Sequence, residues 1–515
     1  MNALEKFFGS FRENIIGHDL HHLINGKRTD VLYADWTASG RLYRPIEDYI
    51  AADLGQYVAN THTETNLTGS TMTAAYHQAQ RIIKKHVNAH QCDALICTGS
   101  GMTAVINKLQ RMMGLRVPAE LAEKVPQTER PVVFVTHMEH HSNQTTWNTC
   151  NVIVEVIKRG ADGLPCLEDL SALLQKYKSH PVKIGSFTAC SNVTGITTNY
   201  HQLAKIMHQN RGLCFVDFAC SAPYVEIDMH PADPLERLDA IFFSPHKFLG
   251  GPGSSGVLVF NKALYATEVP DQPGGGTVTW TNPWGQQGFY ADIELREDGG
   301  TPGFLQTIKV ALAINVKEAM GVKNIHQRER QLTKILMDGL KSIDGIYLLE
   351  PDIEERLCIV SFYAPNHHYN LLVRLLNDKY GVQVRGGCSC AGTYGHILLD
   401  VDQQQSETIT GKIDQGDLSD KPGWVRVSLH PTSTDDEAAF IVNAVTEIMQ
   451  NIDVWQQDYQ FLPAKGDFVH RHAALTKMKD IQDFDVFGQY GITSNSPKNV
   501  SIKQTFKGWV KSHMS

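Results

Sequence analysis

The feature that most constrains the fold of this chain is the alternation of two patterns between residues 90 and 260. Short apolar or β-branched runs predict strands, and helical stretches such as TAVINKLQRMMG and YHQLAKIMHQN lie between them. The strand-like runs are ALICT, PVVFVT, VIVEVI, KIGSFTA, LCFVDF, AIFFS and GVLVF. This alternation predicts an α/β fold in which helices cover a seven-stranded, mostly parallel sheet.

The pattern changes after residue 295. A long helical pattern covers residues 303–342, strands are expected near YLLE and LCIVSFYA, and a further helix is expected over residues 368–380. This order predicts a second, smaller α+β domain. Because 515 residues exceed the usual size of one domain, we expect two packed domains with a cleft between them.

These patterns also set the expected boundaries. We predict an N-terminal segment that packs with the small domain, a large domain that carries the binding site, a small C-terminal domain and a C-terminal extension. In that order they cover residues 1–30, 31–295, 296–450 and 451–515. Within the small domain, residues 397–423 are polar and rich in turn-forming residues, which predicts a surface insertion.

Composition narrows the classes of function. The chain has 47 Lys and Arg against 55 Asp and Glu, and no basic run stands out, so we expect no nucleic-acid partner. We also expect no membrane partner, because no apolar run approaches the length of a membrane span and the N-terminus lacks the features of a signal peptide. The ten cysteines are scattered through strand-like segments, which is typical of reduced thiols. These features predict a cytoplasmic protein that binds a small molecule.

Ligands of parallel sheets bind beyond the carboxyl ends of the strands, so the residues that directly follow each run are the candidates for a site. Polar residues follow five of the runs, at positions 99–103, 137–143, 191–192, 217 and 244–247.

Lys247 is the most informative of these residues. It lies in DAIFFSPHKFLGGPGSSGVLVF, between two strand-like runs. A lysine at a strand end, beside serine, histidine and a glycine-rich stretch, can form a Schiff base with a carbonyl group, pyridoxal phosphate in particular. An ordinary exposed loop lysine is the alternative. Asp217, at the end of LCFVDF, can keep a pyridinium nitrogen protonated, or it can cap a helix.

Two further strand ends carry groups that suit a cofactor. The segment CTGSGMTAVINKL combines a strand, a glycine-bearing turn and a helix that opens at Thr103, whose N–H groups suit a phosphate. The segment FVTHMEHHSNQTTW places His140 and His141 where one of them can stack on a ring and move protons. Three nearby histidines can instead bind a metal. No carboxylate or cysteine accompanies them at a familiar zinc-motif spacing, so we expect no metal site.

The set of motifs resembles the class V aminotransferase group of fold-type I pyridoxal-phosphate enzymes, particularly the cysteine desulfurases and selenocysteine lyases. The resemblance covers residues 30–450, and its motifs follow the family's order. They are YADWTASG, NTHTETN, TGSGMTAVIN, MEHHSN, CSNVTGI, VDFACSAP, SPHKFLGGPGSSGVLV, GGGTV, GGTPG, VRGGCSCAG and VRVSLHPTSTDDE. The resemblance implies the fold of a pyridoxal-phosphate-dependent transferase, with pyridoxal 5'-phosphate as the cofactor.

The resemblance also implies roles for single residues. Lys247 corresponds to the lysine that bonds the cofactor aldehyde, Asp217 to the partner of the pyridine nitrogen, and His140 to the histidine that stacks on the ring. Asn192 corresponds to a polar contact to the ring or the substrate. The positions that match the phosphate-binding segments are Gly101, Met102, Thr103, Ser244 and His246.

Further positions concern the substrate and the oligomer. Arg426 in VRVSL matches the arginine that holds a substrate carboxylate, for which a planar, bidentate fork is suited, and Arg385 and His62 are additional candidates. Thr277 of GGGTV matches a residue that reaches across a dimer into the neighbour's site. A homodimer with a shared active site is therefore implied.

Enzymes of this fold type catalyse several reactions with one cofactor, so the fold does not choose among them. Cys390 in RGGCSCAG lies where desulfurases carry their sulfur-accepting cysteine. Its thiolate would attack the sulfur of the substrate, leave an enzyme persulfide and release alanine. Alternatively, Cys388 and Cys390 are small residues of a glycine loop, or they form a regulatory disulfide.

The chain departs from the family pattern in several places. Cys220 lies where the family typically has a glutamine that bonds the phenolic oxygen of the ring, and Cys388 and Ser389 lie where relatives often have histidines. The polar insertion lengthens the spacing between Cys390 and Arg426, and the chain continues beyond the usual end.

We therefore expect a cytoplasmic, homodimeric, cysteine desulfurase-like transferase or lyase that removes sulfur from L-cysteine, or selenium from selenocysteine. A sulfur-acceptor protein is a candidate partner beside the amino-acid substrate. The first alternative is a class V aminotransferase or C–S lyase that acts on another amino acid. The second is a non-catalytic scaffold that binds a sulfur carrier, against which the joint presence of Lys247, Asp217, His140 and Arg426 argues.

Overall fold

The computed structural model describes residues 2–24, 27–61, 63–472, 481 and 484. Residues 1–472 form one compact unit, and residues 473–515 form a second. The helices and strands of the described residues belong to the first unit. The domain boundaries expected within it stay a prediction.

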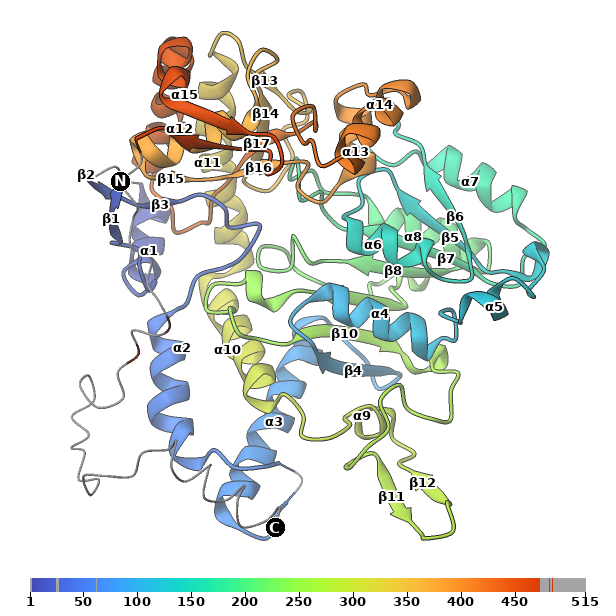
Figure 1. Cartoon of the computed structure of the whole chain (residues 1–515). Helices are drawn as coiled ribbons and strands as arrows, with labels where there is room; N and C mark the ends of the chain where they lie inside the picture. Colours follow the sequence, from blue (N-terminus) through green and yellow to red (C-terminus); the bar gives the residue numbers. More distant parts are fainter. Residues whose placement is uncertain (1, 25–26, 62, 473–480, 482–483, 485–515) are drawn as a thin grey trace, which may run out of the picture. The chain divides into compact units, whose positions relative to one another are not determined.

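Seven strands form the large sheet (Figure 1). They are β4 (Asp93–Thr98), β5 (Val132–Thr136), β6 (Ile153–Ile157), β7 (Lys183–Thr188), β8 (Leu213–Asp217), β9 (Ala240–Phe243) and β10 (Gly256–Asn261). Their order is β4-β10-β9-β8-β7-β5-β6, and β10 runs antiparallel to both of its neighbours, whereas the other adjacent pairs are parallel. Each predicted run supplies one strand, so the predicted α/β fold with a mostly parallel sheet is confirmed.

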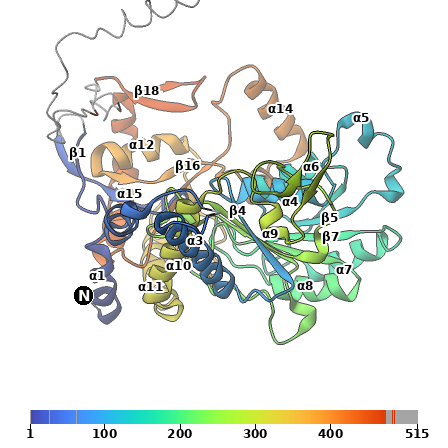
Figure 2. The same cartoon turned by 90° about the horizontal axis from the view of Figure 1, so that it is seen from below.

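Each face of this sheet packs against a buried core. Because successive side chains of a strand point to opposite sides, one strand contributes residues to both cores. Phe243 and Val257 join a core with α7 (Leu167–Lys176), α8 (Tyr200–Gln209) and α10 (Phe304–Met320). Phe242 and Leu258 join a second core with α4 (Met102–Met112) and α6 (His141–Asn148). Helix α3 (Leu67–His86) packs along α10 (Figure 2).

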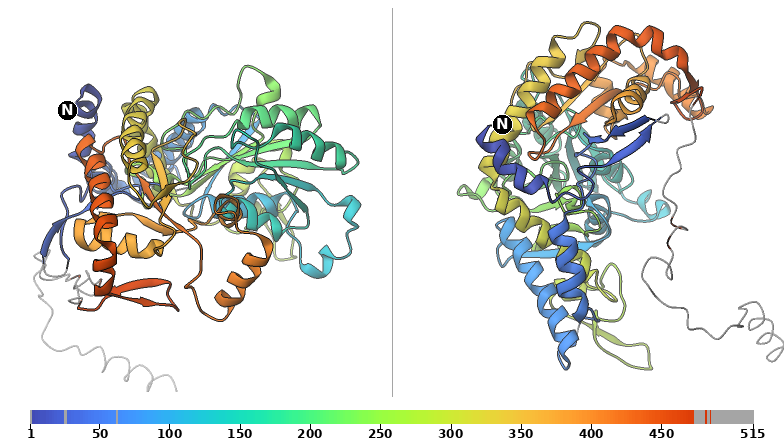
Figure 3. Two further views of the ribbon diagram at one scale, coloured as in Figure 1. Left: turned by 90° about the horizontal axis from the view of Figure 1, so that it is seen from above. Right: turned by 90° about the vertical axis from the view of Figure 1, so that its left-hand side faces the viewer.

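A smaller antiparallel sheet has the order β13-β14-β17-β16. Its strands are β13 (Tyr347–Leu348), β14 (Ile359–Tyr363), β16 (Arg385–Gly387) and β17 (Trp424–Ser428). Helices α11 (Val322–Lys341), α12 (Tyr369–Tyr380) and α15 (Asp435–Trp455) share one apolar core with it, and α11 and α15 lie side by side (Figure 3). The long helix predicted over residues 303–342 is divided in two, because Gly321 adopts a φ of +75° between α10 and α11.

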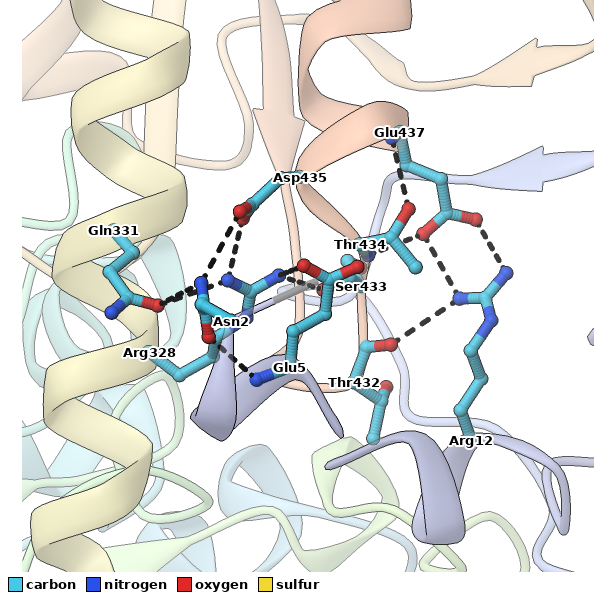
Figure 4. A network of polar contacts seen from close by, with 10 residues as sticks. All are labelled: Asn2, Glu5, Arg12, Arg328, Gln331, Thr432, Ser433, Thr434, Asp435 and Glu437. Atoms are coloured by element: carbon cyan, nitrogen blue, oxygen red, sulfur yellow. Dashed lines mark hydrogen bonds and ion pairs between the residues drawn. The ribbon is translucent and has the colours of Figure 1, made fainter. Parts of the chain in front are cut away.

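The N-terminal helix α1 (Ala3–Arg12) is fixed to the helices of the small sheet by ion pairs (Figure 4). The guanidinium of Arg328 on α11 donates to Asp435 at 2.6 Å and to the carbonyl oxygen of Ser433 at 2.7 Å, and it lies 3.9 Å from Glu5 on α1. Arg12 makes a bidentate pair with Glu437 on α15 at 2.6 and 3.0 Å. Because the Arg328 side chain is fully buried, these contacts replace water that it would otherwise bind.

Shorter elements complete the fold. The strands are β1 (His21–Ile24), β2 (Lys27–Asp30), β3 (Leu32–Tyr33), β11 (Val278–Thr281), β12 (Gln287–Phe289), β15 (Val382–Gln383), β18 (Tyr459–Leu462) and β19 (Asp467–His470). The helices are α2 (Arg44–Asp48), α5 (Ala119–Ala122), α9 (Ile293–Arg296), α13 (Gly392–Leu398) and α14 (Gln403–Asp414), with a π-helical turn at Tyr49–Leu54 and 3₁₀ turns at Gly55–Tyr57, Gln127–Glu129, Pro234–Glu236, Pro245–Lys247, Lys262–Leu264 and Gln456–Asp458.

Helix α14 occupies the segment predicted as a surface insertion. An Asp402 capping box begins it, and each of its residues is exposed or half-exposed. Among the helices of the described residues, none is long and apolar enough to cross a membrane.

Candidate active site

A cavity of about 810 Å³ lies at the carboxyl ends of the parallel strands, where Thr98, Thr188 and Asp217 end β4, β7 and β8. All but two of the predicted site residues line it. They are Gly101, Met102, Thr103, His140, Asn192, Asp217, Ser244, His246, Lys247, Arg385, Cys390 and Arg426. Thr277 lies outside this lining, and its hydroxyl contacts the backbone of Gly274. His62 lies outside the described residues.

Lys247 ends a 3₁₀ turn, Pro245–Lys247, that directly follows β9. Burial lowers the pKa of its ammonium group, whereas the negative charges of Cys220 and Asp217 act in the opposite direction. The uncharged amine, which is the nucleophilic form, is therefore easier to reach than for an exposed lysine.

Asp217 lies at the base of the cavity and is 4 % exposed. Burial raises the pKa of its carboxyl group to about 6, and the N–H of Ala219, which donates to Oδ1 at 2.7 Å, works against that rise together with Lys247. A buried carboxyl group of this kind is suited to bind an N–H⁺ group of a bound ring.

The amino end of α4 forms a cradle for an anion. The N–H of Met102 donates to Ser244 Oγ at 2.9 Å, and the N-cap residue, Gly101, has no side chain to cap the helix. A Cβ atom on Gly101 would lie 3.0 Å from Ser244 Oγ and 3.6 Å from the His246 ring, so glycine keeps this space open. The hydroxyl groups of Thr103 and Ser142 form a hydrogen bond of 2.6 Å with each other at this cradle. Oriented N–H groups and hydroxyls at a helix start are typical of phosphate sites.

His140 is held at the start of α6, where its Nδ1 accepts a hydrogen bond from the N–H of Ser142 at 3.1 Å. Burial lowers the pKa of this imidazole to about 3, with further lowering by Lys247. The ring is therefore neutral, and because Nδ1 accepts, the proton lies on Nε2.

Glu139 fixes the segment that carries His140. Its carboxylate accepts hydrogen bonds from Thr136, Thr188 and Asn143, and thereby ties the ends of β5 and β7 to α6. Glu139 was not among the predicted site residues, because a glutamate beside two histidines gives no sign in the sequence that it will be fully buried.

Cys390 lies on a loop with an unusual backbone between β16 and α13. Ser389 and Cys390 both adopt left-handed conformations, with φ of +52° and +58°. The N–H of His141 donates to the carbonyl oxygen of Cys390 at 2.7 Å, and Asn192 Nδ2 donates to that of Ser389 at 2.7 Å. Cys390 lines the cavity, whereas Cys388 lies outside its lining, and both are free thiols.

Two arginines of the small sheet face the same cavity. Arg426 is 3 % exposed and Arg385 is 50 % exposed at the side chain, and both bind the carboxylate of Asp35. Asp35 belongs to the motif YADWTASG. Its two partners lie 350 and 391 residues further along the sequence, so no local sequence pattern predicted this contact.

Two of the three histidines considered as metal ligands, His140 and His141, have other partners. His140 Nδ1 accepts from Ser142, and His141 Nε2 accepts from the N–H of Gly392 at 2.9 Å. Among the described residues, the group of side chains spaced to hold a metal ion is Cys92, Asp93 and His230, at the opposite end of β4.

Comparisons with known proteins agree with this geometry. The model of the aminotransferase class-V family matches residues 32–440. A probable cysteine desulfurase of Staphylococcus epidermidis (strain ATCC 35984) is 29% identical over 376 residues, which are 72% of this chain and 85% of the relative. One from Staphylococcus aureus (strain N315) is 28% identical over the same length and shares.

Solved structures show the same fold. The apo structure of a cysteine desulfurase from Thermococcus onnurineus NA1 has a TM-score of 0.68 and 21% identity, and covers 86% of this chain and 98% of that one. The cysteine desulfurase CsdA from Escherichia coli, in an S-sulfonic acid form, has a TM-score of 0.65 and 20% identity, with the same two shares.

Proposed function

Because this chain belongs to the class-V aminotransferase family, we propose that it is a pyridoxal-phosphate-dependent cysteine desulfurase. It removes sulfur from L-cysteine, or selenium from selenocysteine, and gives alanine and a persulfide, or its selenium counterpart, on Cys390. The observation that carries this proposal is that Cys390, on the loop between β16 and α13, lines the same cavity as Lys247 and Asp217 of the large sheet.

The residues present fit the proposed cofactor. Asp217 would hold the ring nitrogen, Lys247 would bond the aldehyde carbon, and the amino end of α4 with Ser244 and His246 would hold the phosphate. The space beside Gly101 supports this fit, because a side chain there would fill the cradle. When bound, pyridoxal phosphate supplies an electron-withdrawing ring conjugated with the amino nitrogen of the substrate.

The protein's own groups then bind and orient the substrate. Arg426 would bind its carboxylate, with Nε as the available donor, because no described group accepts a hydrogen bond from that atom. Lys247, with its lowered pKa, and the neutral His140 are the groups in the cavity that can take and return protons.

In the proposed reaction, Cys390 is the residue that accepts the sulfur. Its thiolate attacks the sulfur of the substrate, a new S–S bond forms, and the Cβ–S bond breaks with its electron pair returning to carbon. That carbon takes a proton and becomes the methyl group of alanine. Cys390 is an exposed residue at the cavity, so a separate sulfur-acceptor protein can reach the resulting persulfide.

A homodimer is part of the proposal. Thr277 lies outside the cavity lining of its own subunit and at the base of the hairpin formed by β11 and β12. Trp280 and Trp284 of this hairpin are 52% and 83% exposed, and apolar surface of this kind is typical of a face that a partner covers. A second copy would bring the loop that carries Thr277, a residue buried within its own subunit, to the neighbour's cavity. The cytoplasmic location stays a prediction.

The proposal is tested by incubating purified protein, loaded with pyridoxal phosphate, with L-cysteine and a reductant, while sulfide and alanine are measured together. We expect equal amounts of both products. If neither product forms although the protein shows the absorbance of the bound cofactor, the result would favour another amino-acid reaction.

A further inference from the structure

Arg385 and Arg426 lie directly opposite each other on adjacent antiparallel strands, β16 and β17. Like charges in directly opposed positions destabilise a sheet. The structure offsets this repulsion with a single carboxylate. Asp35 Oδ1 accepts from Arg426 at 2.7 Å, and Oδ2 accepts from Arg385 Nε at 3.0 Å.

Asp35 is held in place by the backbone rather than by the arginines alone. It forms a parallel bridge with Ser428, which follows Arg426 by two residues on β17. The N–H of Ser428 donates to the carbonyl oxygen of Ala34 at 2.8 Å, and the N–H of Thr37 donates to Ser428 Oγ at 3.0 Å. The carboxylate is therefore fixed beside the two guanidinium groups before any ligand arrives.

The cluster formed by Asp35, Arg385 and Arg426 has a net charge of plus one. Two guanidinium groups and one carboxylate leave a single positive charge, beside which His140 is neutral because its pKa is lowered to about 3. Asp35 is 13 % exposed, so solvent screens its charge only in part. Burial lowers the pKa of Lys247, and the negative charge of Asp35 is one of the charges that oppose this lowering.

We propose that Asp35 is a specificity-determining positioning residue, which leaves this site with the charge for one carboxylate and so selects amino acids with an uncharged side chain. The inference rests on the proposed function in one respect, that Arg426 binds the carboxylate of an amino acid. A substrate with a second anionic group, such as a side-chain carboxylate or sulfinate, finds no second net positive charge, because Asp35 already cancels one of the two guanidinium charges. L-Cysteine as a thiol does not require one.

The experiment compares the wild-type protein with Asp35→Asn and Asp35→Glu, each loaded with pyridoxal phosphate. L-Alanine and L-aspartate are titrated separately, and the change in cofactor absorbance gives a Kd for each. We expect Asp35→Asn to raise the affinity for aspartate relative to alanine about tenfold, because one negative charge near the ligand is lost. Asp35→Glu keeps the charge and should keep the wild-type ratio. Asp338→Asn, on an exposed helix position, is the matched control.

An unchanged ratio in Asp35→Asn would overturn the proposal, whether both affinities stay at the wild-type value or fall equally. An equal fall would mean a structural role only. If Asp35→Asn fails to bind the cofactor, Arg385→Gln provides the opposite change in charge, and it should lower the affinity for aspartate more than that for alanine. An equal effect on both would count against the proposal.

The titration also separates this inference from the proposed function. It measures binding and needs no sulfur transfer. Absence of sulfide release together with the expected change in ratio would refute the desulfurase reaction and leave the role of Asp35 intact.

Discussion

The N–H of His141 donates to the carbonyl oxygen of Cys390 at 2.7 Å, and the imidazole of His141 accepts in return from the N–H of Gly392 at 2.9 Å. One residue at the start of α6, beside the large sheet, thus holds both sides of the loop that carries the cysteine. Because Ser389 and Cys390 have left-handed backbones, which cost energy for residues other than glycine, the loop depends on such contacts.

His141→Ala tests this dependence. The variant loses the bond to Gly392, so we expect the Cys390 thiol to lose its fixed position while cofactor binding is unaffected. A misplaced nucleophile lowers the rate by up to about 10²-fold, so kcat for sulfide release should fall by about tenfold or more with little change in KM. His201→Ala, which removes a ring that bonds to the carbonyl oxygen of Glu236 and lies outside the cavity lining, should leave both constants unchanged. An unchanged kcat in His141→Ala would contradict the role.

Cys390→Ser addresses the sulfur acceptor itself. We expect the visible absorbance of the bound cofactor to remain, because Cys390 belongs to the loop between β16 and α13 and is not part of the phosphate cradle, and we expect sulfide release to stop. Cys388→Ser is the matched control, since Cys388 lies outside the cavity lining and should be dispensable. Normal sulfide release by Cys390→Ser would remove this residue from the reaction.

Lys247→Ala should abolish the absorbance that arises from the covalent link between protein and cofactor. Met102 and Ser244, which are proposed to hold the phosphate, are unchanged in this variant, so the cofactor should still bind, reversibly and with the spectrum of the free aldehyde. The measurement is the absorbance spectrum before and after gel filtration. Lys334→Ala, at an exposed position 76 % accessible, is the control and should keep the wild-type spectrum. A wild-type spectrum in Lys247→Ala would show that another lysine forms the link.

The buried carboxyl group of Glu329 should make the stability of the protein depend on pH. Burial raises the pKa of its carboxyl group from 4.5 to about 8, and the N–H of Cys358 opposes this rise. Below the unfolded pKa the carboxyl group is protonated in both states. As the pH rises from 4.5 through about 8, the unfolded chain ionises first, so the folded state loses stability.

Glu329→Gln stays neutral and lacks this loss. We therefore expect Tm of the wild type minus Tm of the variant to become more negative by about 2–4 °C between pH 5 and pH 9. Glu355→Gln, at an 82 % exposed position, is the control for the loss of a surface charge. A constant difference across this pH range would mean that Glu329 ionises at its ordinary pKa.

Arg328→Met breaks the network that fixes the N-terminal helix. It leaves Glu5 and Asp435 without their shared cation, and one-sided removal from a buried ion pair costs about 3–5 kcal/mol. Because Asp435 is 38 % exposed, we expect a cost at the low end, measured as a lower Tm. Arg330→Met, two residues along α11 and 72 % exposed, should change Tm little. Equal effects of the two variants would show that the network is not stabilising.

Several features of the molecule followed from the sequence. Each of the seven apolar runs is a strand of the large sheet, because a strand buried on both faces requires an unbroken apolar run. Lys247 and Asp217 could be assigned to one site, since the carboxyl ends of parallel strands meet at one edge. These inferences depend on local pattern and on a general rule of sheet geometry.

The arrangement across the two sheets depended on the tertiary structure. The sequence separates Asp35 from Arg385 by 350 residues and from Arg426 by 391, and nothing local indicates that one carboxylate serves both. Likewise, the family resemblance pointed to Cys390 rather than Cys388, but only the tertiary structure shows that Cys390 lines the cavity and that Cys388 lies outside its lining. Hydrophobic pattern specifies which side chains are buried within an element. Which charges meet is decided only when elements distant in sequence pack together and lose their water.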